Sequence, residues 1–119
     1  MWHVRYTDEF DAWWRSLSAG EQDAILYGIS LLEKIGPALG RPHVDAVAGS
    51  QFANMKELRC QYRGRPYRVL FAFDPLRSAI MLVGGDKTGE GRFYTKMIRQ
   101  ADRLYADHLQ SLKKKGDDQ

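Results

Sequence analysis

The apolar residues in the first third of the chain repeat with the period of a helix. In residues 8–17 they fall at i, i+3, i+4 and i+7, at Phe10, Trp13, Trp14 and Leu17, and this spacing puts them on one helix face. Thr7 precedes the run as a hydroxyl N-cap. Before it, residues 2–6 alternate apolar and polar, which predicts a short strand.

A second helix is predicted directly after the first. Ser18 and Glu21 have the capping-box spacing, and Gly36-Pro37 ends the helix. Between them, Ile25, Ile29 and Leu32 form one apolar stripe. The two helices are therefore expected to form a hairpin that lies on a flat surface.

The pattern changes to strands between residues 52 and 83, after a loop-like segment at 37–51. Leu58, Cys60 and Tyr62 alternate with polar residues, and a tight turn is predicted at Arg63-Gly64. Residues 67–73 alternate next, and 74–77 have a turn composition. Residues 78–83 are almost all apolar, which predicts a central strand covered on both faces.

The last third is expected to contain a glycine-rich loop at 84–91 and one long helix. The helix stripe consists of Phe93, Met97, Ala101, Leu104, Tyr105, His108 and Leu112. We therefore predict an α+β fold with one domain at residues 1–112 and a frayed polar tail at 113–119. Its sheet has about four antiparallel strands, the first at an edge or beside the central strand. The N-terminal helical hairpin and the C-terminal helix are expected to cover one face.

Composition places the chain among ordinary globular proteins. It has 119 residues, 44% hydrophobic and 28% charged. No apolar run is long enough to cross a membrane, the N-terminus lacks a signal-peptide core, and the single cysteine suits a reducing cytosol. We therefore expect a cytoplasmic protein without a membrane association.

Charge is unevenly distributed along the chain. Residues 1–40 have a net charge of −3, whereas residues 41–110 contain twelve Lys or Arg against seven Asp or Glu. A basic second half favours an anionic partner, either a nucleic acid or an acidic protein segment. A solvated basic face that serves solubility is the alternative.

Five cations lie within thirteen residues on the two predicted central strands. They are Lys56, Arg59, Arg63, Arg65 and Arg68. A short turn joins the strands, so we expect these cations to converge, with Tyr62 and Tyr67 available to stack on unpaired bases. Protection of an exposed strand edge is the alternative interpretation.

The glycine-rich loop lacks the spacing of a nucleotide-binding P-loop. Its glycines could instead let the backbone and Lys87 approach a phosphodiester, or they could simply form a turn. Arg92, Tyr94 and Lys96 flank it. The histidines show no metal-ligand spacing, so neither a metal site nor a cofactor is expected.

Several segments together resemble the HigB-like branch of the RelE/ParE toxins. They include residues 39–42, 54–59, 67–74 and 82–87, with Tyr94 and Leu104-Tyr105. The resemblance covers nearly the whole chain. It implies a RelE-like fold and the toxin of a bacterial type II toxin–antitoxin module.

The resemblance also implies a chemistry. Many members cut messenger RNA in the ribosomal A site, by attack of a ribose 2′-OH on the adjacent phosphorus, using Lys, Arg and Tyr without a metal. By position, Arg68 would stabilise the phosphorane, Lys56 or Lys87 would bind phosphate or act as base, and Tyr94 would lie near the scissile nucleotide. RNA contacts are expected at Arg59, Arg63, Arg65, Arg92 and Lys96.

One departure and two alternatives follow. The Phe-x-Lys-Lys element frequent in this branch is replaced by Gly85-Asp86-Lys87-Thr88, which leaves the identity of the base open. A ParE-like toxin that inhibits DNA gyrase, or a non-catalytic RNA-binding module, would share the fold. The implied partner is a helix-turn-helix antitoxin, in an assembly that can be a heterotetramer.

Overall fold

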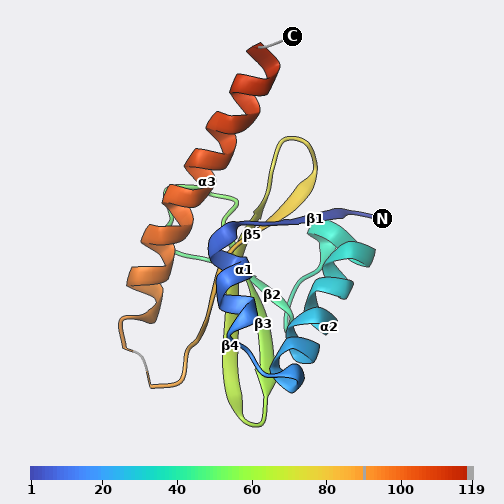
Figure 1. Cartoon of the computed structure of the whole chain (residues 1–119), viewed down its shortest axis with the longest axis vertical. Helices are drawn as coiled ribbons and strands as arrows, with labels where there is room; N and C mark the ends of the chain where they lie inside the picture. Colours follow the sequence, from blue (N-terminus) through green and yellow to red (C-terminus); the bar gives the residue numbers. More distant parts are fainter. Residues whose placement is uncertain (90, 118–119) are drawn as a thin grey trace.

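A five-stranded sheet lies between two helical layers in the computed structural model, which describes residues 1–89 and 91–117 (Figure 1). The sheet order is β1-β5-β4-β3-β2. The elements, in chain order, are β1 (His3–Tyr6), α1 (Asp8–Arg15), α2 (Ala19–Ile35), the short 3-10 turn η1 (Gly36–Ala38), β2 (Val44–Ala46), β3 (Lys56–Tyr62), β4 (Arg65–Phe73), β5 (Ser78–Asp86) and α3 (Phe93–Asp117).

The predicted α+β class and the antiparallel β3-β4-β5 meander are confirmed. Two details of the sheet differ from expectation. A fifth strand, β2, pairs antiparallel with β3 inside the segment predicted as loop. β1 lies at an edge beside β5 as predicted, but it runs parallel to β5, whereas an antiparallel sheet was expected. A three-residue strand is too short to show an alternating pattern in the sequence. It forms because it pairs with β3, and this pairing cannot be seen in the segment itself.

Local capping chemistry explains the helix boundaries. The Thr7 hydroxyl accepts the Phe10 N–H at 3.0 Å and donates to the Leu82 carbonyl at 2.6 Å, which fastens the start of α1 to β5. The capping box between Ser18 and Glu21 forms as predicted. The β3–β4 turn places Arg63 at φ 51° and Gly64 at φ 79°, the left-handed pair that a two-residue hairpin favours.

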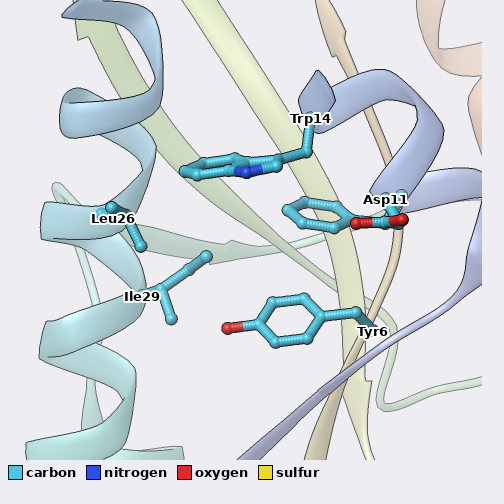
Figure 2. Close-up of a pocket in the computed structure, with 6 residues that line it drawn as sticks. Tyr6, Asp11, Trp14, Leu26 and Ile29 are labelled. Carbon is cyan, nitrogen blue, oxygen red and sulfur yellow. The ribbon is translucent and has the colours of Figure 1, made fainter. Parts of the chain in front are cut away.

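The first core fills the space between the sheet and the N-terminal helices. Phe10, Ile25, Ile29 and Leu32 pack against the odd-numbered residues of β4 and their neighbours on β3 and β5. A shallow hollow of about 240 Å³ remains between α1 and α2 (Figure 2). It is lined by Tyr6, Phe10, Asp11, Trp14, Leu26 and Ile29.

The second core lies on the opposite face of the sheet, under α3. Ala101 and Tyr105 pack against Leu70, Ala72 and Leu82. The expectation that all helices cover one face was therefore wrong, because β4 and β5 present apolar side chains on both faces and each face needs a cover. The prediction that 78–83 is central and doubly covered is confirmed.

Helix α3 is longer than expected. It continues to Asp117, so it enters the segment predicted as a frayed tail; residues 118–119 lie outside the described residues. At its side, His108 Nε2 lies 2.8 Å from Asp74 Oδ2, and Asp74 in turn accepts the backbone N–H groups of Leu76 and Ser78. None of the helices described in this structure combines the length and the hydropathy that a bilayer span requires.

Candidate functional site

The centre of the candidate site is a row of charged side chains on the α3 face of the sheet. Arg59 of β3 stands opposite Arg68 of β4 in the strand register, and Glu57 stands two residues along β3, opposite Leu70. Leu70 belongs to the core under α3, and alternate residues of a strand share a face. Glu57, Arg59 and Arg68 therefore all belong to the α3 side.

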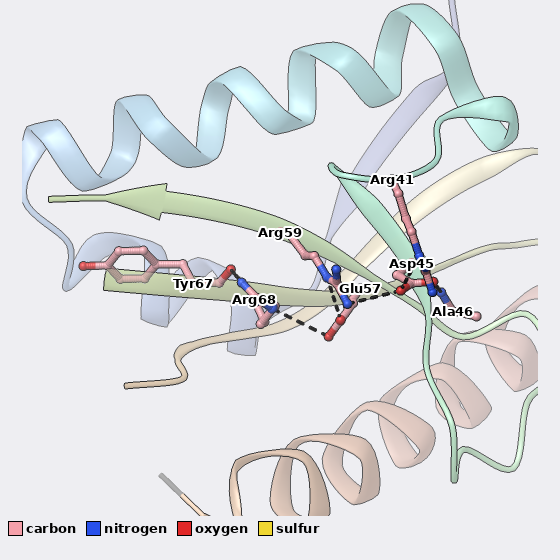
Figure 3. Close-up of polar contacts among 7 residues, drawn as sticks. All are labelled: Arg41, Asp45, Ala46, Glu57, Arg59, Tyr67 and Arg68. Atoms are coloured by element: carbon pink, nitrogen blue, oxygen red, sulfur yellow. Dashed lines mark hydrogen bonds and ion pairs between the residues drawn. The ribbon is translucent and has the colours of Figure 1, made fainter. Parts of the chain in front are cut away.

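The charges in this row alternate in sign and are joined in a line (Figure 3). Arg59 Nε donates to Glu57 Oε1 at 3.0 Å, and Arg68 Nε lies 3.9 Å from Glu57 Oε2. Arg59 also reaches Asp45 Oδ2 at 3.2 Å, and Arg41 reaches the same oxygen at 3.0 Å. Glu57 thus holds two arginines in fixed positions.

The Glu57–Arg68 end of this line is more buried than the Arg59 end. The side chain of Arg59 is 35% exposed, whereas those of Arg68 and Glu57 are 10% and 4% exposed. Arg68 Nη1 donates to the Tyr67 carbonyl at 3.0 Å. Glu57 Oε2 and Arg68 Nε have no hydrogen-bond partner among the described residues. A buried guanidinium with unused donor capacity is suited to an anionic ligand.

Tyr94 brings α3 to this row. Burial raises the pKa of its phenol, interaction with Glu57 raises it further, and Arg68 opposes the shift. The Lys87 ammonium lies 5.2 Å from the centre of the Tyr94 ring. Arg68, Tyr94 and Lys87 therefore come from three different elements and meet where α3 begins.

The glycine-rich loop was expected to begin at residue 84, but Gly84 and Gly85 belong to β5, where Gly85 makes room for α3 on this face of the sheet and Gly84 makes room for α1 on the other. A Cβ at Gly84 would lie 2.3 Å from the Trp13 ring of α1, and a Cβ at Gly85 would lie 2.9 Å from the Phe93 ring of α3. Both residues belong to a strand that extends to Asp86. Their role is close helix packing on the two faces of the sheet.

The other expected cations are more scattered. Lys56 pairs with Phe71 in the register, and Phe71 belongs to the core under α1 and α2, so Lys56 lies on the face away from Arg68. Arg63 and Arg65 lie at the exposed tip of the β3–β4 hairpin, with Arg65 3.8 Å from Asp86. The expected convergence of all five cations was therefore wrong. Within β3, Lys56 and Arg59 lie an odd number of residues apart and so face opposite sides of the sheet, and Arg63 and Arg65 lie at the tip of the hairpin.

The remaining expectations concern the start of α3 and the strand tyrosines. Arg92 and Lys96 are exposed beside the first turn of α3. Tyr67 is 2% exposed and its hydroxyl donates to Glu21, while the Tyr62 hydroxyl lies against Gly20 of α2. Both tyrosines therefore pack under α2, and the idea that they stack on bases was wrong.

Sequence reasoning missed two parts of the site. Glu57 is not among the residues that the sequence pattern singled out, although it is two residues from Arg59 and alternate residues of a strand share a face. Arg99 and Arg103 of α3 were not considered, although their i, i+4 spacing beyond Tyr94 puts them along one side of the helix. Among the described residues, no three His, Cys, Asp or Glu side chains gather closely enough to hold a metal ion.

Comparison with known proteins agrees with this architecture. The profile of the family described as "Phage derived protein Gp49-like (DUF891)" matches residues 12–106. Two relatives from Mycobacterium tuberculosis, named as toxins HigB2 and HigB3, are each 45% identical over 104 residues. The chain belongs to the Gp49-like family of HigB-type toxins. The predicted resemblance to the HigB-like branch is thereby confirmed.

The lengths of the HigB-type relatives differ. The match covers 86% of this chain and 52% of HigB2, so the chain spans about half the length of that relative. It covers 87% of this chain and 90% of HigB3. A mutant of the E. coli toxin RelE in the free state has the same fold, with a TM-score of 0.55 over 82% of this chain and 95% of that chain, at 11% identity. The predicted RelE-like fold is confirmed.

Proposed function

We propose that this chain is the toxin of a bacterial type II toxin–antitoxin module, and that it cuts messenger RNA on the ribosome in the cytoplasm. The observation that carries the proposal is the junction of Arg68, Lys87 and Tyr94 on the α3 side of the sheet. With Arg59 the junction has three cations against Glu57 and Asp45. An excess of positive charge in a half-buried setting suits a phosphodiester.

The reaction we propose is attack of a ribose 2′-oxygen on the adjacent phosphorus. The new O–P bond forms a cyclic phosphate as the bond from phosphorus to the 5′-oxygen breaks. Arg68 donates hydrogen bonds to the phosphorane, where negative charge accumulates. Glu57 keeps the Arg68 guanidinium in place through their ion pair.

Proton transfer is assigned to the two groups at the start of α3. Because burial raises the pKa of Tyr94, the phenol keeps its proton at neutral pH and can give it to the leaving 5′-oxygen. Lys87 acts as the base in its neutral amine form, after its ammonium has lost a proton to water, and takes the proton of the 2′-hydroxyl as the new O–P bond forms. The Tyr94 phenolate then regains a proton from water, so both groups return to their starting states. Lys56 has no part, because it lies on the other face of the sheet.

The first experiment is cleavage of a translated messenger by purified protein, with the product ends mapped by primer extension. Tyr94→Phe keeps the ring and removes the proton, so we expect cleavage to slow by about 10²-fold or more. Tyr27→Phe removes the same atom from an exposed ring of α2 and should cleave at the wild-type rate.

Arg68 is tested by loss of growth arrest in cells. Arg68→Ala should abolish both arrest and cleavage, and Lys87→Met provides a second variant that leaves the buried Glu57 pair intact. If the wild-type protein arrests growth but leaves every transcript intact, the nuclease proposal is wrong. Inhibition of DNA supercoiling by the same protein would then identify a gyrase-directed toxin, whereas salt-sensitive RNA binding alone would indicate a binding module.

We also propose a helix-turn-helix antitoxin as partner, seated on the hollow between α1 and α2. Tyr6 and Leu26 are 51% and 47% exposed and border the same hollow, so together with its lining they form an apolar patch that a partner can cover. Leu26→Asp should prevent co-purification with the antitoxin, whereas Leu76→Asp, at a more exposed site on the β4–β5 turn, should not. The mass of the complex tests the expected heterotetramer.

A further inference from the structure

A second hollow adjoins the proposed cleavage site and has no part in the chemistry described above. It measures about 720 Å³ and lies between residues 48–51 and the first four turns of α3. Tyr94 forms one end of its wall, so this ring is shared between the hollow and the Arg68 junction. Arg99 and Arg103 lie further along the same wall.

The wall opposite α3 is fixed by a buried carboxylate. Asp102 is 8% exposed. Its Oδ1 accepts the Ser50 hydroxyl at 2.5 Å, and its Oδ2 accepts the Gln51 N–H at 2.9 Å. The Phe52 ring then meets the Tyr105 ring edge-on at 4.8 Å. The hollow is therefore held open by the fold and needs no rearrangement to receive a ligand.

The wall carries a net positive charge, with Arg99 and Arg103 against the single carboxylate of Asp102. Both arginines are exposed, and neither makes an ion pair with a described residue. Asp102 lies between them in sequence, but both of its oxygens already accept hydrogen bonds from the 50–51 segment. Arg99 and Arg103 are four residues apart, so their backbones are separated by about 6 Å along the helix.

We propose that this hollow binds the RNA strand next to the cleaved linkage, with Arg99 and Arg103 each contacting one phosphate. The inference rests on the proposed function. The spacing between Arg99 and Arg103 suits successive phosphates of an extended strand, and Ile98 provides an apolar surface for a ribose or base. Gly49, opposite Ile98, has no side chain to obstruct the strand. An RNA that leaves the Tyr94 ring enters this hollow directly, which favours RNA over an acidic protein segment.

The size of the effect follows from counterion release. Affinity for a single strand scales as salt concentration to the power of about −0.7 per phosphate contact, so two lost contacts lower affinity about 25-fold at about 0.1 M salt. The slope of log affinity against log salt should fall by about 1.4. Arg99→Gln/Arg103→Gln is the variant, because glutamine preserves the helix and removes both charges.

The experiment measures binding of a fluorescent 2′-O-methyl RNA, which cannot be cut because the attacking hydroxyl is blocked. The matched control is Lys113→Gln/Lys114→Gln, which removes two charges from the far end of α3. We expect the 25-fold loss and the smaller salt slope only for the arginine variant. Equal affinity of both variants, or failure of the wild-type protein to bind, would overturn the inference. So would loss of antitoxin binding with RNA binding unchanged, which would assign the hollow to a protein.

A parallel cleavage assay separates this inference from the proposed function. If the wild-type protein cuts messenger RNA and Arg99→Gln/Arg103→Gln cuts with the same kcat/KM, the hollow is not a strand site and the nuclease proposal stands. The opposite outcome is also possible: the wild-type protein does not cut messenger RNA, while binding of the 2′-O-methyl RNA still depends on both arginines. In that case the nuclease proposal is wrong and the strand site stands.

Discussion

Removing the charge of Glu57 should destabilise the fold strongly, because this carboxylate is buried between two arginines. In Glu57→Gln, Arg59 loses a charge-assisted hydrogen bond at 3.0 Å but keeps Asp45 at 3.2 Å and is 35% exposed, so we assign about 1 kcal/mol to it. Arg68 is 10% exposed and loses its only carboxylate neighbour of the described ion pairs, which adds about 2 kcal/mol. The total is about 3 kcal/mol.

Urea unfolding followed by tryptophan fluorescence measures this change. For a chain of this length, 3 kcal/mol corresponds to a fall in Tm of roughly 12 °C. Glu57→Leu/Arg68→Leu removes both charges and should lie within about 1 kcal/mol of the wild type, since a buried pair replaced by apolar residues loses its desolvation cost as well. Asp107→Asn, an exposed carboxylate on α3, is the charge control.

Two results would refute the reasoning. If Glu57→Gln were as stable as Asp107→Asn, the carboxylate would not be holding the arginines. If the double variant were less stable than Glu57→Gln, the cost would come from shape and packing rather than from an uncompensated charge. Either result would also remove the argument that Glu57 fixes the Arg68 guanidinium for phosphate binding.

Three further predictions concern the rest of the fold. Gly84→Ala should cost about 2 kcal/mol in urea unfolding, since its Cβ would lie 2.3 Å from the Trp13 ring, whereas Gly40→Ala meets open space and should stay within about 0.5 kcal/mol. Burial raises the pKa of the Cys60 thiol to about 12, so a thiol reagent at pH 8 should react about 10³-fold more slowly with the folded than with the unfolded chain. The hydrogen bond from the Tyr67 hydroxyl lowers the pKa of Glu21 below 4.5. The contact therefore stabilises the fold above that pH, and its contribution is lost as the pH falls. Glu21→Gln should lower Tm at pH 7 and have less effect near pH 3.

The helices, which have strong apolar periodicity, could be predicted from the sequence. The face of the sheet that each helix covers could be predicted only in part. Ser18, Glu21 and the stripe of α2 are local signals, and they gave the correct helix. The stripe of α3 also formed as predicted, but a periodic pattern does not say which face of a sheet a helix covers. Leu70 and Ala72 on one face and Val69 and Phe71 on the other leave that choice to the whole fold.

The candidate site was predictable where strand alternation was applied and unpredictable where distant elements meet. Lys56 and Arg59 differ in parity, so the sequence already contained the signal that separates them. Tyr94 and Lys87 could be assigned near the site only through the family resemblance, because their distance from Arg68 depends on how α3 packs over Gly85. No local pattern describes such a contact.

The order of the strands also protects this chain from self-association. Its two most apolar strands, β4 and β5, have nine residues each and lie inside the sheet, while the edges are β1 with four residues and β2 with three. Short edges offer little backbone for another molecule to pair with. β1 pairs with the apolar half of β5, residues Ser78–Met81. Detachment of β1 would expose the backbone of this buried segment to pairing with another chain, so the β1 contact also limits aggregation.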